Sequence, residues 1–393
     1  MIDRPNQRGW HFLQIPGPSN TPGRVLRAMG QPTVDHRGPA FEVLAKRILE
    51  KLRRVFQTSG HVIIYPSSGT GAWEAALVNL FKPGDTVLAY ETGHFAVLWK
   101  TLAIKIGLNV EWIEGDWRHG ADPSKIESLL KADKQQRIKG VMVVHNETST
   151  GITSNIQAVR EAIDMAGHPA LLLVDVVSSL CTTKFNQDAW GVDVAICASQ
   201  KGLMLPPGLG FNSINEKARL AAKGIQSIHS YWQWEKIIEI NETGYFPYTP
   251  ASGLFYGLDE SLSMIFEEGL DGLVDRHKKL AAACRTAVDT WGLENQCADE
   301  KEYSDSTTAL IMPPGHNADE LRRFILENYN MSLGSGLGKL KSKVFRIGHL
   351  GDFNELMLMA ALSGVEMGMM AKGVPFQKGG VQAAMDFLTQ DKL

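Results

Sequence analysis

The sequence predicts an α/β protein in which a mostly parallel sheet is flanked by helices, followed by a smaller α+β domain. Short apolar runs alternate with helical apolar spacing over residues 61–214, which is typical of parallel strands joined by helical crossovers. Two long helical segments and a shorter strand–helix module complete the chain. We expect an N-terminal arm at 1–20, a large domain at 21–255 and a small C-terminal domain at 256–393.

The composition is that of an ordinary globular protein. Of the 393 residues, 44% are hydrophobic and 21% are charged, and the net charge of -3 offers no basic field for nucleic acid or an anionic membrane. The N-terminus lacks the pattern of a signal peptide, and no uncharged apolar run reaches the ~18 residues of a membrane span. We therefore expect a cytoplasmic protein with no nucleic-acid or membrane partner. The cysteines have neither disulfide-framework nor metal-ligand spacing: Cys181, Cys197, Cys284 and Cys297.

The N-terminal segment is predicted to be an ordered loop. Residues 15–22, IPGPSNTP, contain two Gly/Pro turns, so the backbone around Gly17 can approach a ligand closely. Helical apolar spacing follows over 38–57, and HVIIY at 61–65 is typical of a buried strand.

A polar turn follows that strand and opens an amphipathic helix. Residues 66–71 read PSSGTG, and free backbone amides at a helix N-terminus form a ready anion site. A plain capped turn has the same pattern. The candidate phosphate-binding residues are Ser68, Gly69 and Thr70.

The strand and helix patterns then alternate regularly. Strands are expected at 86–90, 109–114, 140–145, 170–175, 192–198 and 208–214, and helices at 94–106, 123–132 and 155–166. Ligands of such sheets collect at the carboxyl ends of the strands. Five side chains follow strand ends and are expected to share one site: Ser68, Phe95, Thr148, Asp175 and Lys201.

Asp175 and Lys201 suggest the chemistry of that site. A strand-end aspartate can keep a ring nitrogen protonated, and a desolvated lysine can react with an aldehyde. Pyridoxal 5'-phosphate (PLP) requires these two protein groups. A lysine after an apolar strand is, however, usually a solvated strand end.

Residues 226–250 interrupt the alternation with an aromatic-rich segment that we expect to be irregular. Such clusters occur more often in interfaces than in catalytic sites. Helices are expected at 252–268 and 272–292. The module that follows is predicted to contain strand 307–312, helix 317–329, strand 343–348 and helix 353–372.

The ordered motifs together resemble a known family. PSSGTGAWEAAL, HNETSTG, HPALLLVDVVSS, WGVDVAICASQKG, PYTP and SKVFRIGHLG are similar to segments of the class V aminotransferases of PLP fold type I, especially its serine–glyoxylate and alanine–glyoxylate members. The resemblance covers nearly the whole chain. It implies PLP as cofactor and a homodimer with shared active sites, or a tetramer.

The resemblance assigns roles by position. Lys201 matches the lysine that binds PLP covalently and moves a proton, and Asp175 matches the acid facing the pyridine nitrogen. Arg346 matches the arginine that binds the substrate carboxylate, and Gly17 is the second residue expected to bind the substrate. The other matched cofactor contacts are Ser68, Gly69, Thr70 and Gln200 at the phosphate, and Phe95, Thr148 and Val177 around the ring. Thr249, with either Tyr245 or Tyr248, matches contacts to the phosphate of the neighbouring subunit.

The resemblance implies a transaminase that moves an amino group from a small L-amino acid to glyoxylate. L-Serine, giving hydroxypyruvate, is the first expectation, and L-alanine, giving pyruvate, is the second. L-Aspartate remains an alternative donor, and His36, Arg37, His94 and His349 are candidates for binding its second carboxylate. A PLP-dependent lyase is a more distant alternative. Val176 departs from the family pattern, in which glycine often follows the aspartate.

Overall fold

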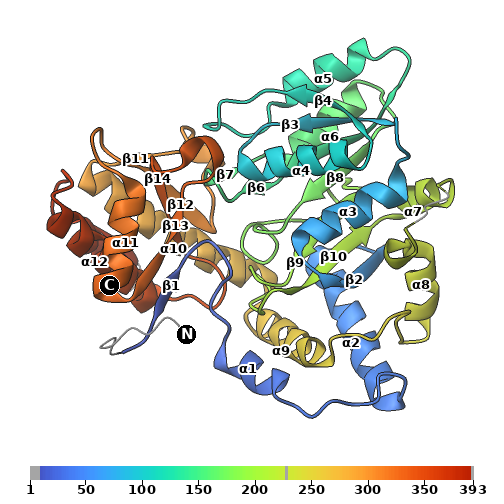
Figure 1. Ribbon diagram of the computed structural model, residues 1–393, viewed down its shortest axis with the longest axis horizontal. Helices are drawn as coiled ribbons and strands as arrows, with labels where there is room; N and C mark the ends of the chain where they lie inside the picture. The colour runs from blue at the N-terminus through green and yellow to red at the C-terminus, as the bar shows by residue number, and fades with distance from the viewer. Residues whose placement is uncertain (1–8, 226–228, 391–393) are drawn as a thin grey trace.

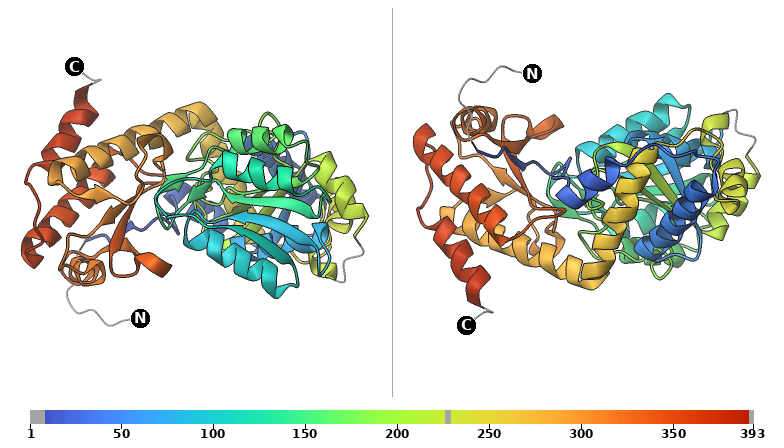
Figure 2. Two further views of the ribbon diagram at one scale, coloured as in Figure 1. Left: turned by 90° about the horizontal axis from the view of Figure 1, so that it is seen from above. Right: turned by 90° about the horizontal axis from the view of Figure 1, so that it is seen from below.

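The computed structural model describes residues 9–225 and 229–390 and contains two separate sheets (Figure 1). The views in Figure 2 place the sheets in two lobes, with the first strand in the lobe of the smaller sheet. The α/β class predicted from the sequence is confirmed. No helix in the described ranges is long and apolar enough to cross a membrane.

The large sheet has seven strands and is mostly parallel. In spatial order they are β2 (His61–Ser67), β10 (Gly208–Ile214), β9 (Val194–Ala198), β8 (Leu171–Asp175), β5 (Ile138–Val144), β3 (Thr86–Tyr90) and β4 (Asn109–Ile113). Only β10 is antiparallel to its neighbours in this sheet. The carboxyl ends of β8 and β9 therefore lie together, which places Asp175 and the segment leading to Lys201 at one edge.

Helices cover both faces of this sheet. One face packs against α1 (Gly23–Met29), α2 (Pro39–Phe56), α5 (Pro123–Ala132), α6 (Ile156–Met165) and α9 (Ser252–Glu268). The other packs against α3 (Gly69–Leu80), α4 (His94–Lys105), α7 (Glu216–Lys223) and α8 (Trp234–Glu242). Strand β8 is apolar on both sides because Leu172 and Val174 face the first layer while Leu171 and Leu173 face the second.

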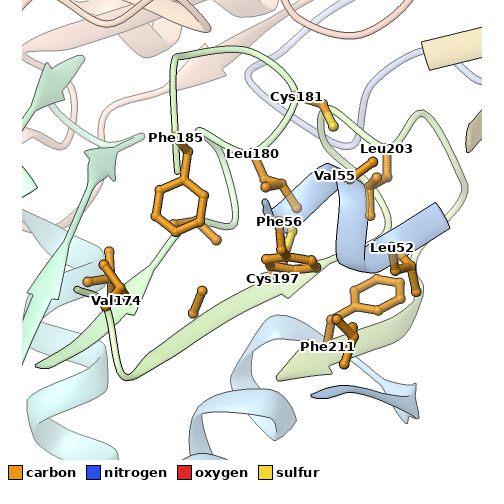
Figure 3. Packing of buried hydrophobic residues seen from close by; sticks show 14 of the residues in the cluster. Leu52, Val55, Phe56, Val174, Leu180, Cys181, Phe185, Cys197, Leu203 and Phe211 are labelled. Atoms are coloured by element: carbon orange, nitrogen blue, oxygen red, sulfur yellow. The ribbon is translucent and has the colours of Figure 1, made fainter. Parts of the chain in front are cut away.

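Close packing supports the strand ends that lead to the site. In Figure 3, Val174 of β8 and Cys197 of β9 lie in a cluster with Phe56 of α2 and with Phe185, which belongs to the loop between β8 and β9. All four side chains are buried, and the thiol of Cys197 is enclosed. Tight packing resists displacement of backbone, so the residues that follow these strands start from fixed positions.

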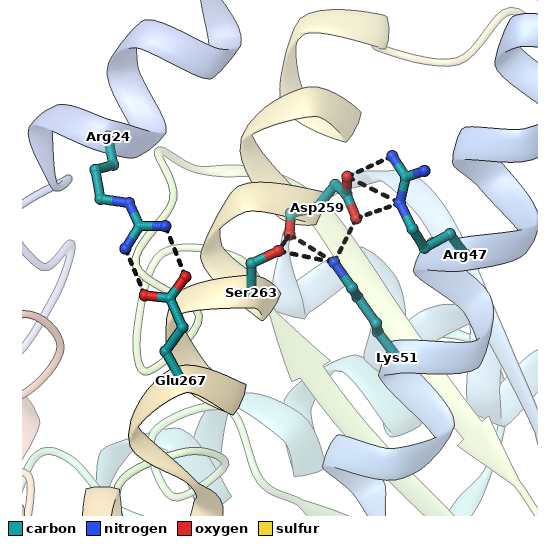
Figure 4. A network of polar contacts seen from close by, with 6 residues as sticks. All are labelled: Arg24, Arg47, Lys51, Asp259, Ser263 and Glu267. Carbon is teal, nitrogen blue, oxygen red and sulfur yellow. Dashed lines mark hydrogen bonds and ion pairs between the residues drawn. The ribbon is translucent and has the colours of Figure 1, made fainter.

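Helix α9 is tied to the large lobe by charge as well as by packing (Figure 4). Its Asp259 accepts hydrogen bonds from Arg47 at 2.6 Å and Lys51 at 2.7 Å, both on α2, and its Glu267 pairs with Arg24 of α1 at 2.6 Å. The expected domain boundary after residue 255 falls inside α9. We propose that the large domain extends through α9 and that α10 (Leu270–Trp291) connects it to the small domain.

The small sheet has five strands, in the order β1 (Phe12–Gln14), β13 (Met331–Ser335), β14 (Val344–Gly348), β12 (Thr307–Ile311) and β11 (Glu294–Asn295). Helices α10, α11 (Ala318–Tyr329), α12 (Glu355–Lys372) and α13 (Gly380–Thr389) form its core with it. The N-terminal arm joins this sheet, since Phe12 pairs with Met331 in parallel register.

The expectation of irregular structure at 226–250 was wrong in part. Residues 226–228 lie outside the described ranges, but α8 is helical because Trp234, Ile237 and Ile238 recur with helical spacing and are buried. The shorter elements are β6 (Asn146–Glu147) paired with β7 (Ile152–Thr153), and 3-10 turns η1 (Ser230–Trp232), η2 (Glu300–Glu302) and η3 (Gly338–Leu340). The interface predicted for residues 226–250 remains a prediction.

Candidate active site

A cavity of about 250 Å³ lies beyond the carboxyl ends of the central strands. The polar residues expected to share one site all line it, and ten of the sequence-predicted residues are present in its wall: Gly17, Ser68, Gly69, Thr70, Phe95, Thr148, Asp175, Val177, Gln200 and Lys201. The fold therefore brings together segments from five different strand ends and the N-terminal arm, as expected for an open α/β sheet.

Asp175 is the last residue of β8 and is buried. One carboxylate oxygen accepts the Val177 amide at 2.7 Å, and the other accepts the indole N–H of Trp73 at 2.8 Å. Burial raises the pKa of Asp175 to about 7, while the hydrogen bonds from Val177 and Trp73 oppose that rise. The carboxylate is thus fixed in position and poised to hold a positive partner.

Lys201 lies three residues beyond the end of β9, and its side chain is buried. Burial, followed by the charge of Arg346, lowers the pKa of Lys201 to about 7. The Nζ amine donates to the carbonyl of Pro16, and the Ser19 hydroxyl donates to the Lys201 carbonyl at 2.9 Å. The N-terminal loop therefore holds a partly neutral amine, the form required for a nucleophile.

The polar turn before α3 is built as an anion site requires. Ser68 is the N-cap of α3 and accepts from the Gly71 amide at 3.5 Å, a long contact. Gly69 allows Val177 to approach, because a Cβ at Gly69 would lie 3.2 Å from Val177 Cγ2. Amides of the first helical turn have no intrahelical acceptor and so can receive an anion.

Thr148 joins the cavity to Arg346. Its hydroxyl donates to Ser178 Oγ at 2.8 Å, and its carbonyl accepts from Arg346 Nη1 at 2.8 Å. Arg346 is only 6% exposed on β14, and its Nε donates to the Ser335 carbonyl at 2.8 Å. Burial lowers the pKa of Arg346 to about 10. Arg346 has no direct ion pair among the described residues, although the charge of the buried Glu147 opposes the fall in its pKa.

Three predicted cofactor residues lie outside the cavity of their own chain. The Tyr245 hydroxyl donates to Glu42 at 3.2 Å, the Tyr248 hydroxyl donates to the Ile64 carbonyl, and Thr249 is exposed. None of the three lines the cavity. Their role toward a second subunit remains a prediction.

Comparison with known proteins places these features in a family. Residues 11–341 match the family described as aminotransferase class-V. The chain belongs to the class V aminotransferases. A serine–glyoxylate aminotransferase of Methylorubrum extorquens is 48% identical over 98% of both chains, and an L-aspartate–glyoxylate aminotransferase of Paracoccus denitrificans is 42% identical over 96% of both. The crystal structure of pyridoxamine–pyruvate aminotransferase from Mesorhizobium loti matches with a TM-score of 0.91 and 27% identity, over 98% of this chain and 99% of that one.

Class V aminotransferases are PLP-dependent enzymes of fold type I, so both the fold class and the cofactor expected from the sequence are confirmed. The residues present fit this cofactor. The buried amine of Lys201, the positioned carboxylate of Asp175 and the open amides of the α3 turn supply an aldehyde-reactive group, a ring-nitrogen partner and a phosphate site. The Gln200 side-chain oxygen is buried without a hydrogen-bond partner among the described residues, so this amide group is free to turn its NH2 donors toward a ligand in the cavity.

Sequence reasoning missed several residues of this class V aminotransferase site. Trp73 was interpreted only as part of an amphipathic helix, yet its ring lines the cavity and holds Asp175. Asn146 and Ser178 also line the cavity, and the Asn146 side-chain amide donates to Ser178 at 2.8 Å. The position of Asn146 directly beyond a predicted strand was the available signal. For Trp73, a buried indole N–H needing an acceptor would have been the signal.

Proposed function

We propose that this aminotransferase moves the amino group of L-serine to glyoxylate, giving hydroxypyruvate and glycine, and that L-alanine is a second donor giving pyruvate. The names of the relatives support this choice, because the serine–glyoxylate enzyme of Methylorubrum extorquens shares more of this sequence than the L-aspartate enzyme of Paracoccus denitrificans does.

The observation that carries the proposal is the buried and unpaired Arg346 guanidinium. Arg346 does not itself line the cavity, but it lies against Thr148, which does, and its N–H groups that are not bound to the Ser335 and Thr148 carbonyls can bind one carboxylate. Lys201 is the only cationic side chain in the cavity wall as described, and its amine is needed for the cofactor. A substrate with one carboxylate therefore matches the charges available, whereas a dicarboxylate would desolvate a second charge without a partner.

The candidates for a second carboxylate site are poorly suited to it. His349 is fully buried, with one ring nitrogen on the Asp305 carbonyl at 3.0 Å and the other on the Thr308 hydroxyl at 3.0 Å. His94 is half-buried at the start of α4, where burial and then Arg346 lower its pKa and so disfavour its cationic form. His36 and Arg37 precede α2 and do not line the cavity.

The chain's own groups then perform defined tasks. PLP, when bound, supplies an electron sink that carries the amino group from one substrate to the other. Asp175 holds the ring nitrogen in its charged form, and the α3 turn with Gln200 binds the phosphate. Lys201 Nζ, partly neutral because burial lowers its pKa to about 7, would accept the proton from the substrate carbon and deliver it to the cofactor. Arg346 orients the substrate by its carboxylate.

We also propose that the enzyme works as a homodimer in the cytoplasm. Thr249 and one of Tyr245 and Tyr248 would reach the cofactor phosphate of the second subunit, which agrees with their position outside their own cavity. Four free and buried thiols are typical of a reducing compartment.

Half-reactions test the donor. Protein loaded with PLP is mixed with L-serine, L-alanine or L-aspartate, and the loss of the visible absorbance of the bound cofactor is followed. We expect serine to be fastest. If aspartate were about tenfold faster, a transition-state preference of ~1.4 kcal/mol, the L-aspartate–glyoxylate alternative would replace the serine assignment. Competition between glyoxylate and 2-oxoglutarate at equal concentration tests the acceptor, with glyoxylate expected to win.

A PLP-dependent lyase is the remaining alternative. It would release a product from the amino acid without needing a 2-oxo acid, so release of product in the absence of glyoxylate would favour it. A desulfurase of the same fold, which needs a reactive cysteine thiolate, is disfavoured because all four thiols are buried. Burial raises the pKa of Cys181 and Cys297 to about 12.

A further inference from the structure

Helix α4 begins without a cap from its own chain segment. Its N-cap position is Gly93, which has no side chain to accept the free amides of the first turn. Those amides are instead bound by the segment that follows β5. The Phe95 and Ala96 amides donate to the two carboxylate oxygens of Glu147 at 3.3 and 3.2 Å, and the His94 amide donates to Ser149 Oγ at 2.9 Å.

Glu147 is fully buried, and the described hydrogen bonds of its side chain are made to the N-terminus of α4 and to Ser149. Besides the two α4 amides, it accepts the amide and the hydroxyl of Ser149, at 3.1 and 2.5 Å. A carboxylate at a helix N-terminus is favoured by the helix dipole and by charge-assisted hydrogen bonds. These donors offset the cost of burial, which raises the pKa of Glu147.

Gly93 permits this contact to form. A Cβ at Gly93 would lie 2.5 Å from Glu147 Cγ and 2.5 Å from Ser149 Oγ. Such distances require either the helix or the glutamate to move, because no side chain tolerates them. Gly93 and Glu147 thus form one unit, although they come from different parts of the chain.

The same unit borders two groups of the proposed site. Phe95, whose amide Glu147 binds, lines the cavity. Thr148, which follows Glu147 directly, lines it too and accepts a hydrogen bond from Arg346 at 2.8 Å. A shift of Glu147 would therefore be transmitted to the aromatic wall of the cavity and to the support of the arginine.

We propose that Glu147 is a positioning residue, which docks the N-terminus of α4 so that the Phe95 ring is held in the cofactor cavity. This inference rests on the proposed cofactor site, and it adds a cause for the position of the ring. Glu147 does not line the cavity, so it positions the ring through the α4 amides, and its charge also opposes the fall in the pKa of Lys201 and Arg346.

Two variants separate the reach of the side chain from its charge. Glu147→Asp keeps the charge but retracts the carboxylate by one methylene, so it loses the α4 amides. Glu147→Gln removes the charge and keeps one oxygen, which can accept from only one of the two α4 amides, while its NH2 group faces the other. Gly93→Ala displaces the same contact from the other side without altering the glutamate. Glu91→Gln is a matched control, because Glu91 is also a buried carboxylate but binds Trp117 and Lys339 in place of α4.

The readouts are the dissociation constant for PLP and the visible circular dichroism per mole of bound PLP, which reports how rigidly the ring is held, with the melting temperature measured alongside. We expect Glu147→Asp and Gly93→Ala to weaken PLP binding by about fivefold or more, the usual size of a lost helix cap, and to reduce the dichroism. Glu147→Gln should also weaken PLP binding, because it keeps only one of the two acceptors, whereas Glu91→Gln should stay within about twofold of wild type.

The proposal is overturned if Glu147→Asp binds PLP with unchanged affinity and dichroism, or if Glu91→Gln is affected equally. Glu147→Gln tests the same contact without shortening the side chain: PLP affinity and dichroism equal to wild type in this variant would also overturn the proposal. Failure of the wild-type protein to bind PLP would instead contradict the proposed function, so the two failures are distinguishable.

Discussion

The indole N–H of Trp73 donates to the carboxylate of Asp175 over 2.8 Å, joining the first turns of α3 to the end of β8. Trp73 also stacks on Trp99 of α4, with ring centroids 5.7 Å apart and planes inclined by 13°. The aspartate is therefore held from the layer of helices that also presents the anion-binding turn.

Replacing Trp73 with Phe should weaken PLP binding while leaving the fold intact. The change removes one donor to Asp175, and a hydrogen bond to a charged group contributes roughly 1.5–3 kcal/mol, so a loss of about tenfold or more in PLP affinity is expected. Because that donor opposes the rise in the pKa of Asp175, the pKa should move further upward. Equilibrium titration with PLP as a function of pH measures both effects. Trp99→Phe, which loses no bond to Asp175, is the control.

Lys201→Met should stabilise the cofactor-free protein, and most strongly at low pH. The folded-state pKa of Lys201 is about 7 and its unfolded value is 10.5, so the unfolded chain binds more protons between these values. The penalty for burying the charged amine is therefore complete below about pH 7 and disappears as pH rises through 10.5. Melting temperatures of the two proteins across that window should converge with increasing pH. A constant difference would contradict the assignment.

The same Lys201→Met protein should lose covalent PLP. Borohydride reduction of wild-type protein should attach the cofactor to the peptide that contains Lys201, and the variant should give no adduct there. An adduct at the same peptide of the variant would mean that another amine is used.

Replacing Arg346 with Lys should impair use of both substrates. Lysine keeps the charge but loses the planar group that contacts the Ser335 and Thr148 carbonyls and that, in the proposed role, would bind the substrate carboxylate. A loss of roughly 100-fold in kcat/KM is expected, from ~3 kcal/mol of charge-assisted hydrogen bonding. Arg322→Lys is a matched control, since Arg322 lies nearby on α11 but pairs with Asp319 at 3.0 Å. Equal loss in both variants would indicate a general electrostatic effect.

Mixing subunits tests the shared site. A Lys201→Met homodimer should bind PLP poorly because it lacks the amine that binds PLP covalently. A Thr249→Ala homodimer should bind PLP poorly because it lacks the contact to the phosphate of the second subunit. A mixed dimer would combine Lys201 of one chain with Thr249 of the other and restore one complete site. In a random 1:1 mixture, about half of the sites that contain Lys201 belong to mixed dimers, so PLP affinity should recover in about half of them. A Thr249→Ala homodimer that binds PLP as tightly as wild type would remove the basis for this design.

Much of the site could be predicted because its residues follow continuous apolar runs. Asp175 and Lys201 come after strands that are buried on both faces, and the rule that ligands bind at carboxyl strand ends placed them together. Strand direction was harder to obtain: the pattern of β10 is that of any buried strand, and only its pairing with β2 and β9 shows that it runs antiparallel. Periodicity reports burial and not orientation.

The residues that were missed depend on contacts between distant segments. Trp73 looks like a core residue of α3 until its indole is seen to face Asp175, which is 102 positions away. The carboxylate of Glu147 similarly caps a helix that begins 53 positions earlier, and a sequence motif cannot show that pairing. In α8 the helical spacing of Trp234, Ile237 and Ile238 was overlooked because the segment was interpreted only as an aromatic cluster. The burial of these three side chains shows that they form one face of a helix.

The route of the N-terminal arm has a consequence for how the protein is made. The loop at Gly17 lines the cavity, and its Pro16 carbonyl accepts a hydrogen bond from the Lys201 amine. The neighbouring strand β1, however, pairs with β13 of the small sheet. The His11 ring also forms a hydrogen bond with Asn330, which is 319 positions away in the sequence. During synthesis, Phe12–Gln14 leaves the ribosome long before Met331–Ser335, so β1 must wait for β13 before it can dock. The cavity therefore gains its Gly17 wall only after β13 has been made.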